Sequence, residues 1–150
     1  HVWIIVGEKI LLQKRAEDKK LYPGVWDISA AGHIGAGEKP LQAALRETQE
    51  ELGLMIEPED LEFGFLQELQ STEAGINDHE IDYVYFVRIE SIDGLSLQKE
   101  EVAQIRLASP EELEEDFREN PQRYTPHTEY WPRVIRYSKE LAKGADIYSK

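Results

Sequence analysis

The sequence predicts an α/β (α+β) fold with a mixed central sheet and helices on both of its faces. Segments with strand and helix patterns alternate irregularly along the chain, and some strands follow one another as hairpin-like pairs. The 150 residues contain no internal repeat, low-complexity tract or linker, so we expect one domain over residues 1–150. A hydrophobic fraction of 41%, with seven Tyr, four Phe and three Trp, indicates a folded core.

The first forty residues are predicted to be rich in strands. Val2–Val6 and Ile10–Lys14 have the pattern of two strands joined by a turn, and Val25–Ala31 that of a short third strand. The loop over residues 32–37 holds three glycines, which permit sharp turns and close backbone approach. Because the chain starts inside a strand and lacks an initiator Met, we expect the natural protein to extend further upstream.

A helix is predicted over residues 39–52. Pro40 suits the first turn of a helix, and Gly53 supplies a C-terminal stop. Four side chains recur at steps of four, three and four residues, which places them on one helical face: Leu41, Leu45, Thr48 and Leu52. This stripe is expected to pack against the sheet.

The second half of the chain continues the alternation. Three further strands are predicted at residues 62–70, 81–89 and 102–108. The strand at 81–89 is apolar on parts of both faces, which is typical of a central strand, and a polar loop at 71–79 precedes it. Ser109–Pro110 marks the start of one helix, and a last helix is predicted over 131–142.

The chain is strongly acidic, with 17 Lys and Arg against 30 Asp and Glu and a formal net charge of −13. This charge argues against a nucleic-acid polymer or an anionic membrane as partner, since both need basic patches. The absence of Cys excludes a disulfide framework, a thiolate zinc site and a cysteine nucleophile. No apolar run is long enough to span a membrane and no secretory signal is present, so we expect a cytoplasmic protein.

Some polar residues are interpreted as ordinary surface. The acidic run Glu111–Glu119 has the composition of a solvated helix face. His79 and His127 are also interpreted as ordinary surface residues.

One pattern carries chemistry, and it fixes seven positions: Gly32, Glu38, Arg46, Glu47, Glu50, Glu51 and Gly53. At about 100° per residue, Glu47, Glu50 and Glu51 share one side of the predicted helix, beside the apolar stripe. Carboxylates this close repel one another unless a cation lies among them, and hard oxygen ligands suit Mg²⁺ or Mn²⁺. Arg46 on the flank can hold a carboxylate by a charge-assisted hydrogen bond.

A metal site of this kind implies a phosphate substrate. Mg²⁺ held by few carboxylates usually shares its coordination shell with substrate phosphates, polarises a phosphorus–oxygen bond and activates water. The implied reaction is hydrolysis of a diphosphate by water attack at phosphorus. The alternative is a solvated acidic helix face, but chance gives this spacing in this composition with a probability on the order of 10⁻⁵.

The spacing G-x5-E-x7-R-E-x2-E-E-x-G resembles the Nudix box, so the chain is identified as a member of the Nudix hydrolase family. The resemblance implies an α/β/α sandwich, Mg²⁺ (or Mn²⁺) as cofactor, and a small substrate that contains a diphosphate, such as a nucleoside diphosphate-linked compound. It also implies a role for each position of the box: Glu50 and Glu51 as metal ligands, Glu47 as ligand or general base, Glu38 as an outer or additional ligand, the Gly32 carbonyl as a ligand, and Arg46 as the residue that orients the glutamates. Thr48 departs from the family, which usually has an aliphatic residue there.

In many Nudix hydrolases, a glutamate far from the box helps to activate water. Glu101, just before the predicted strand at 102–108, is the first candidate here, followed by Glu100 and Glu80. Each of the three is equally well explained as a surface glutamate.

Three segments extend the resemblance beyond the box: Leu11–Arg15, Lys20–Asp27 and Ala31–His33. They resemble the branch of the family that contains type I isopentenyl-diphosphate isomerases and their hydrolase-like relatives. The isomerases carry a catalytic Cys just before the Gly-His pair, where this chain has Ala31, and they tend to lose glutamates of the box. Both differences favour a hydrolase over an isomerase, and the complete box argues against a non-catalytic diphosphate-binding module.

The resemblance to the isomerases also implies a second metal site. His33 and His1 match positions that bind a second metal in those enzymes, and Glu80 lies near the position of a third ligand. The alternative assigns His33 to the loop or to a helix cap and His1 to a strand, with no metal bound.

A basic cluster stands out in this acidic chain: Lys14, Arg15, Lys19 and Lys20. It either meets the phosphates of the substrate, for which Lys14, Arg15 and Lys20 are the predicted residues, or forms a solvated loop. The group attached to the diphosphate is expected to be recognised by loops such as 71–79. The protein is expected to be a monomer or a homodimer.

Overall fold

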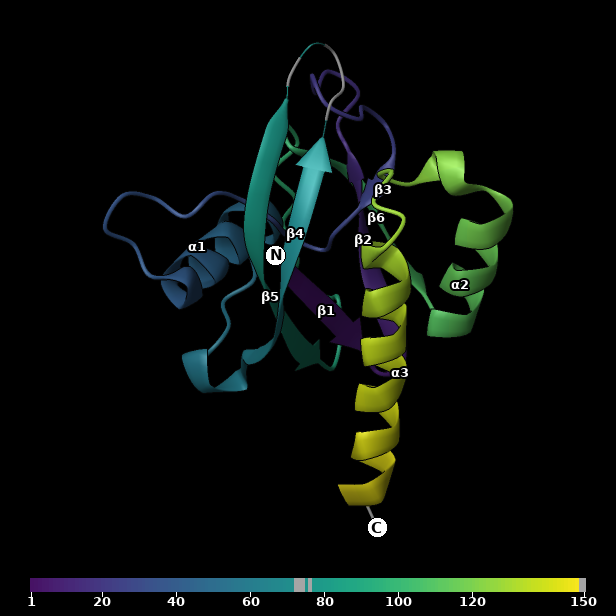
Figure 1. Ribbon diagram of the computed structural model, residues 1–150. Coiled ribbons are helices and arrows are strands. Elements are labelled where there is room, and N and C mark those ends of the chain that lie inside the picture. Colours follow the sequence, from purple (N-terminus) through teal and green to yellow (C-terminus); the bar gives the residue numbers. More distant parts are fainter. Residues whose placement is uncertain (72–74, 76, 149–150) are drawn as a thin grey trace.

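Six strands form one sheet in the computed structural model, which describes residues 1–71, 75 and 77–148, with side chains over 1–70, 75 and 77–142 (Figure 1). The strands are β1 (Val2–Val6), β2 (Lys9–Arg15), β3 (Trp26–Asp27), β4 (Glu62–Ser71), β5 (Asp78–Ile89) and β6 (Val102–Ala108). The helices are α1 (Pro40–Leu52), α2 (Pro110–Glu119) and α3 (Tyr130–Tyr148), with short 3₁₀ turns at Pro58–Asp60 and Pro121–Arg123. Over the described residues, no helix combines the length and the apolar character needed to cross a bilayer.

The sheet is mixed, as the sequence predicts. Its strand order is β3-β2-β1-β5-β4, and β6 pairs with β2 outside this path. β1 runs parallel to β5, whereas the other pairings are antiparallel. β5 therefore has a neighbour on each side, as expected for a strand that is apolar on both faces.

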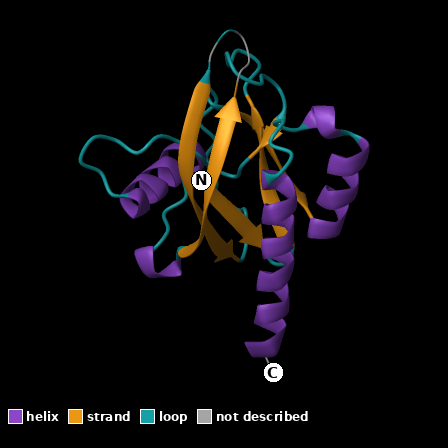
Figure 2. Cartoon of the chain, viewed as in Figure 1, coloured by secondary structure: helices purple, strands orange, loops and turns teal. Residues whose placement is uncertain are grey.

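Helices cover both faces of the sheet (Figures 1 and 2). α1 lies on one face, and α2 and α3 lie together on the other. Side chains along β1 point alternately to the two faces of the sheet and so pack into both apolar clusters. Val2 and Ile4 belong to the cluster under α1, and Trp3 and Ile5 belong to the cluster under α3. The predicted α/β/α sandwich is thus confirmed.

α1 confirms the helix predicted from the apolar stripe. Pro40 occupies its first position, and Gly53 ends it in the left-handed conformation (φ 66°), where the Gly53 N–H donates to the Gln49 carbonyl at 2.8 Å. Thr48 is fully buried, and its hydroxyl donates to the Ala44 carbonyl at 2.8 Å, so a polar residue is accommodated at an otherwise aliphatic position.

The third predicted strand, Val25–Ala31, is shorter than expected, because only β3 joins the ladder with β2. The next residues wedge between β1 and β2. The Ser29 hydroxyl accepts a hydrogen bond from the Ile4 N–H at 2.9 Å and donates to the Leu11 carbonyl, while Ala30 exchanges two backbone hydrogen bonds with β1. This wedge leads the chain directly to the Gly-rich loop and α1.

Three elements extend further than predicted: α3, β4 and β5. The last helix, α3, starts at Tyr130, one residue before the predicted start, because the N–H groups of Tyr130 and Trp131 both donate to the His127 carbonyl, at 3.1 and 3.2 Å. At its other end α3 continues beyond the predicted residue 142 to Tyr148. The strands β4 and β5 include both ends of the predicted loop at 71–79. Residues 72–74 and 76 of that loop lie outside the described residues.

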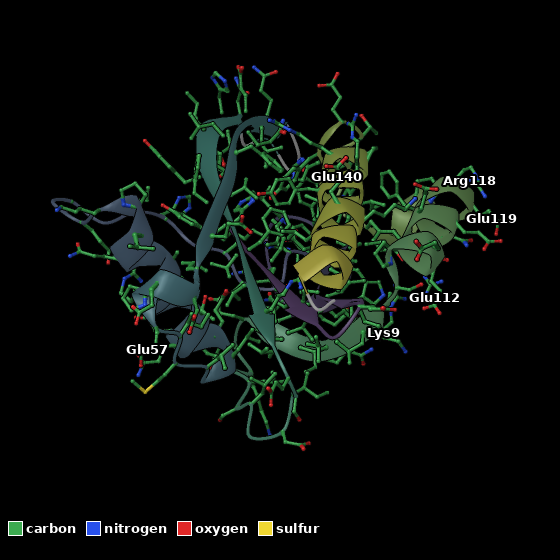
Figure 3. The ribbon with its side chains drawn as sticks, turned by 90° about the horizontal axis from the view of Figure 1, so that it is seen from below. Lys9, Glu57, Glu112, Arg118, Glu119 and Glu140 are labelled. Atoms are coloured by element: carbon green, nitrogen blue, oxygen red, sulfur yellow. The ribbon has the colours of Figure 1, made fainter. Side chains whose placement is uncertain are left out.

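Most of the acidic run Glu111–Glu119 on α2 is exposed, as Figure 3 shows for Glu112 and Glu119. Asp116 is the exception, since it is half-buried and accepts a hydrogen bond from the Tyr124 hydroxyl. The interpretation as a solvated face therefore needs correction at Asp116, which ties α2 to the segment after it.

The packing of α1 on the sheet can be tested at Leu52, which is fully buried. Leu52→Ala should lower the free energy of unfolding by about 2–5 kcal/mol, because it removes buried methyl groups and leaves a cavity under the helix. Met55→Ala is the matched control: Met55 is 80% exposed, so this change should have an effect below about 0.5 kcal/mol. The measurement is urea unfolding at equilibrium, and equal effects of the two variants would contradict this packing.

Candidate active site

A cleft of about 570 Å³ opens beside α1 and the Gly-rich loop before it. Further parts of its wall come from β5, from the end of β2 with the loop after it (residues 15–22), and from the segments around 98–101 and 125–127. Such a concave surface, built from distant parts of the chain, is the usual setting of a small-molecule site. Five of the seven motif positions line it: Gly32, Arg46, Glu47, Glu50 and Glu51.

Arg46 connects the carboxylates of the motif. Its Nε and Nη2 donate to the two oxygens of Glu38 at 2.8 and 2.9 Å. Its Nη1 donates to Glu47 Oε1 at 2.6 Å and to Glu50 Oε2 at 3.3 Å. Nη2 also donates to the His33 carbonyl at 3.0 Å, which ties the loop to the helix. This planar fork of donors is the geometry that the predicted orienting role requires.

Glu38 is fully engaged in this network. The hydrogen bonds from Arg46, together with one from the Gly35 N–H at 2.9 Å, lower the pKa of Glu38 to about 2. Both of its oxygens have partners, so Glu38 is arranged to hold Arg46 in place. Its predicted role as an outer or additional metal ligand stays a prediction.

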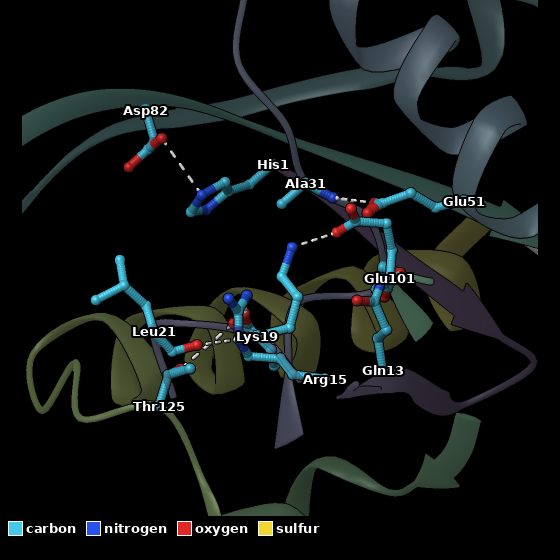
Figure 4. Close-up of polar contacts among 12 residues, drawn as sticks. His1, Gln13, Arg15, Lys19, Leu21, Ala31, Glu51, Asp82, Glu101 and Thr125 are labelled. Carbon is cyan, nitrogen blue, oxygen red and sulfur yellow. Dashed lines mark hydrogen bonds and ion pairs between the residues drawn. The ribbon is translucent and has the colours of Figure 1, made fainter. Parts of the chain in front are cut away.

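Glu51 is the most buried carboxylate of the motif, with 5% of its surface exposed. Its Oε1 accepts a hydrogen bond from the Ala31 N–H at 2.8 Å (Figure 4). Burial, reinforced by the charges of Glu47 and Glu101, raises the pKa of Glu51 to about 7. A buried carboxylate among others of the same sign is compensated when a cation binds beside it.

Gly32 passes so close to α1 that any side chain there would overlap the carboxyl group of Glu47. Only glycine allows the loop to approach the carboxylates in this way. Glu47, Glu50 and Glu51 each keep one oxygen that takes no hydrogen bond from Arg46 or Ala31. These hard oxygen donors beside a close-lying main chain fit the predicted Mg²⁺ or Mn²⁺.

Glu101, the first candidate for water activation, lines the cleft. Its Oε2 forms an ion pair with Lys19 Nζ at 2.5 Å (Figure 4), and its charge contributes to the raised pKa of Glu51. Glu80 also lines the cleft, whereas Glu100 is exposed and is not part of the wall. The geometry therefore narrows the three candidates to Glu101 and Glu80.

The cleft receives only part of the predicted basic cluster. Arg15 lines it, while Lys14 and Lys20 do not. Arg15 is also engaged elsewhere, because its Nη1 forms an ion pair with Asp27 at 3.1 Å. Lys19 does line the cleft, although it is not among the residues predicted to meet the phosphates, which are Lys14, Arg15 and Lys20. No spacing in the sequence distinguishes Lys19 from its neighbours.

The residues predicted to form a second metal site come together only in part. His1 and Glu80 offer ligand atoms within 4.8 Å of each other, and the third member of that group is Asp82. His33 lies at the rim, with its side chain 89% exposed and Nδ1 3.9 Å from Glu80 Oε2. A signal for Asp82 existed, since two acids separated by one residue on a strand point to the same face.

Other residues of the cleft were not selected by the sequence analysis, among them Gln13, Thr125 and His127. Gln13 is buried, donates to the Ser29 carbonyl at 3.0 Å and forms a side-chain hydrogen bond with Glu51. His127 corrects the interpretation as ordinary surface, because it is half-buried at the cleft and burial lowers its pKa. His79 is exposed, as expected, and pairs with Glu68 at 2.6 Å.

The site combines a Gly-rich loop with a helix that carries carboxylates, on one face of an α/β/α sandwich. Comparison with known proteins identifies the class of protein that has this arrangement. Residues 1–128 match the NUDIX domain family. The chain is 39% identical over 134 residues to Nudix hydrolase 3 of Arabidopsis thaliana, covering 85% of this chain and 17% of that protein. It is 35% identical over 121 residues to an isopentenyl-diphosphate Delta-isomerase of Paenarthrobacter aurescens, covering 81% of this chain and 64% of that protein.

Among solved structures, a MutT protein from Methanosarcina mazei has the same fold, with a TM-score of 0.72 and 18% identity over 94% of this chain and 91% of the other. The chain belongs to the Nudix hydrolase family. Its resemblance to both hydrolases and isomerases of that family is confirmed. The chain spans less than two thirds of the length of these two relatives.

The role of Arg46 can be tested with a substitution that keeps its charge. Arg46→Lys removes the planar fork that binds both oxygens of Glu38, so the glutamates lose their fixed positions. We expect Mg²⁺ affinity, or activity at limiting Mg²⁺, to fall by about 10–100-fold. Arg118→Lys on exposed α2 is the control and should leave both unchanged. Unaltered Mg²⁺ affinity in Arg46→Lys would remove Arg46 from this role.

Proposed function

We propose that the protein is a Mg²⁺- or Mn²⁺-dependent hydrolase that cleaves a small diphosphate substrate, such as a nucleoside diphosphate-linked compound, by water attack at phosphorus. The observation that carries the proposal is the cluster of Glu47, Glu50 and Glu51, which Arg46 and the Ala31 N–H hold around the main chain at Gly32. An acidic protein can hold a polyanion at such a cluster once divalent ions neutralise the charge between them.

The roles follow from position. Glu47, Glu50, Glu51 and the carbonyl of Gly32 would hold the metal, which when bound supplies Lewis acidity toward a phosphoryl oxygen and a more acidic water. Glu101 would take the proton from the attacking water, and its ion pair with Lys19 holds its carboxylate in place at the cleft. Arg15 and Lys19 lie where they can meet the phosphates or the leaving group.

An isomerase is the rival function, because isopentenyl-diphosphate isomerases are among the relatives. Moving a proton at carbon needs an acid or base where those enzymes carry Cys, and Ala31 offers only a methyl group. A non-catalytic binding module is a second rival, and the complete carboxylate cluster argues against it. Solvent hydrogen exchange into isopentenyl diphosphate would support the first rival.

The decisive experiment is a substrate screen with Mg²⁺. The panel contains nucleoside di- and triphosphates, dinucleotide polyphosphates, sugar nucleotides and prenyl diphosphates. Cleavage between two phosphorus atoms, with oxygen from ¹⁸O-labelled water found on a product phosphate, is the expected result. A panel without any hydrolysis would refute the proposal.

The site assignment predicts the effect of Glu51→Gln. This change keeps an oxygen for the Ala31 N–H but removes the charge, so kcat should fall by more than about 100-fold while the fold is retained. Glu57→Gln makes the same change at an exposed position outside the cleft and should leave kcat unaltered (Figure 3). Activity is measured on whichever compound the screen identifies, and a Glu51→Gln variant of full activity contradicts the assignment.

Removal of metal should separate activity from stability. A chelator such as EDTA should abolish hydrolysis, and added Mg²⁺ or Mn²⁺ should restore it. Thermal unfolding should change little, because Arg46 already compensates Glu38, Glu47 and Glu50 without a metal. Activity that survives exhaustive chelation would rule out the metal-dependent reaction.

A further inference from the structure

Arg15 enters the cleft on the strand that also reaches the carboxylate cluster. Gln13 and Arg15 lie two residues apart on β2, so their side chains share one face of the sheet, and both line the cleft. Gln13 forms a side-chain hydrogen bond with Glu51. One step along this face, about 7 Å, separates Gln13 from Arg15. A small anion held at the cluster is therefore within reach of the Arg15 guanidinium.

Two of the three guanidinium nitrogens of Arg15 are already engaged. Nε donates to the Leu21 carbonyl at 2.9 Å (Figure 4), and Nη1 donates to Asp27 Oδ2 at 3.1 Å. The strand register explains the second contact: Asp27 on β3 lies opposite Gln13, which makes it a diagonal neighbour of Arg15. Nη2 meets no acceptor among the described residues, so its N–H groups remain for an anion in the cleft.

Asp27 is itself held from the core. It is 8% exposed, and its Oδ1 accepts a hydrogen bond from the Thr125 hydroxyl at 3.3 Å. Thr125 is fixed in turn by the buried Trp131 of α3, whose Nε1 donates to the Thr125 carbonyl at 2.9 Å. Both oxygens of Asp27 therefore have a partner, and the Arg15 guanidinium is tied through Asp27 to the core under α3.

The charge and the hydrogen bond of Asp27 act in opposite directions on an anion in the cleft. The negative carboxylate offsets part of the positive potential of Arg15, which weakens the attraction to a phosphate. The hydrogen bond fixes a long side chain that would otherwise lose rotamer freedom when the anion binds. It also gives Nη2 one direction, as a hydrogen bond to a phosphate oxygen requires. A variant that removes only the charge should therefore differ from one that also removes the acceptor.

We propose that Asp27 is a positioning residue, which holds the Arg15 guanidinium so that Nη2 donates to a phosphate oxygen of the substrate. Asp27 itself touches no substrate in this arrangement and acts only through Arg15. The inference rests on the proposed hydrolysis of a diphosphate, and it names the residue that sets where one phosphate of that substrate is held.

The test compares two variants of equal charge. Asp27→Asn keeps an oxygen acceptor for Arg15, and its N–H₂ can donate to the Thr125 hydroxyl, whereas Asp27→Leu has no acceptor. Calorimetry measures their affinity for imidodiphosphate, a hydrolysis-resistant diphosphate analogue, in the presence of Mg²⁺. Asp27→Leu should bind it at least about tenfold more weakly than Asp27→Asn. A difference below about twofold, or a wild type that binds no imidodiphosphate, would overturn the inference.

Asp18 gives the matched control, because it is an exposed acid on the loop after β2 and does not line the cleft. Asp18→Asn and Asp18→Leu should bind imidodiphosphate equally. A second comparison repeats the Asp27 pair in an Arg15→Met background, where the two variants should differ by less than about twofold because Asp27 acts through Arg15. A difference of about tenfold that persists without Arg15 would show a general structural role and overturn the inference.

A further measurement covers the case in which Asp27→Leu fails to fold by circular dichroism. Relaxation of the Arg15 ¹⁵Nε nucleus reports how tightly the guanidinium is held in the wild type. Its order parameter should approach that of rigid backbone, about 0.85, whereas that of the exposed Arg118 on α2 should fall below about 0.6. An Arg15 side chain as mobile as that of Arg118 would overturn the inference.

Hydrolysis and this inference can fail separately. If no compound of the screen is hydrolysed but Asp27→Leu loses imidodiphosphate binding and Asp27→Asn does not, the proposed function fails and the inference stands. Hydrolysis with equal KM in Asp27→Asn and Asp27→Leu overturns only the inference. Mn²⁺ titration followed by electron paramagnetic resonance should give the same affinity in both variants as in the wild type. Weaker Mn²⁺ binding in Asp27→Leu alone would place the effect at the carboxylate cluster and overturn the inference.

Discussion

The site depends on one guanidinium. α1 carries three glutamates on one side, and carboxylates at this spacing repel one another unless a positive group lies among them. Arg46 supplies it from the same helix, and its fork reaches back to Glu38 and to the His33 carbonyl, so helix and loop become one rigid unit. A lysine could supply the charge but not the five fixed donors. The carboxylates are thus already positioned by Arg46, and little reorganisation would be needed for the metal of the proposed function to bind.

The irregular segment that follows β3 provides another part of the site. Ser29 and Ala30 leave the β3 ladder and wedge between β1 and β2, which carries the chain past α1 within contact distance. There the Ala31 N–H fixes Glu51, and the bare Cα of Gly32 lets the loop lie against Glu47. The strand prediction over 25–31 therefore fails for a physical reason: Ser29 and Ala30 hydrogen-bond to β1 and β2, and the Ala31 N–H bonds to Glu51, so the segment does not continue the ladder with β2.

The features that the sequence predicted well depend on interactions between residues that are close in the sequence. The period of α1, the N-cap at Ser109 and the alternation in the long strands depend on neighbours a few residues away, so the α/β/α fold and the box carboxylates could be foreseen. Lys19 could not be selected, because its place at the cleft depends on the path of a loop. The spacing of Asp82 from Glu80 indicates that the two share one face of a strand, but the contact of Asp82 with His1 depends on the register of β1 against β5. His127 reaches the cleft on a segment that lies 74 residues after Gly53, the end of the box, and no spacing in the sequence indicates this return.

Position 31 explains how one fold serves two chemistries among its relatives. The backbone N–H of Ala31 fixes Glu51, and any residue except proline supplies an N–H at this place. The side chain at 31 can therefore change without disturbing the carboxylate cluster. Where the resemblance implies Cys in isomerases, a thiol would stand beside the carboxylate cluster. With Ala31 and a complete set of box glutamates, the proposed hydrolase would have no side chain at this position to move a proton at carbon, and water would be the group that reacts.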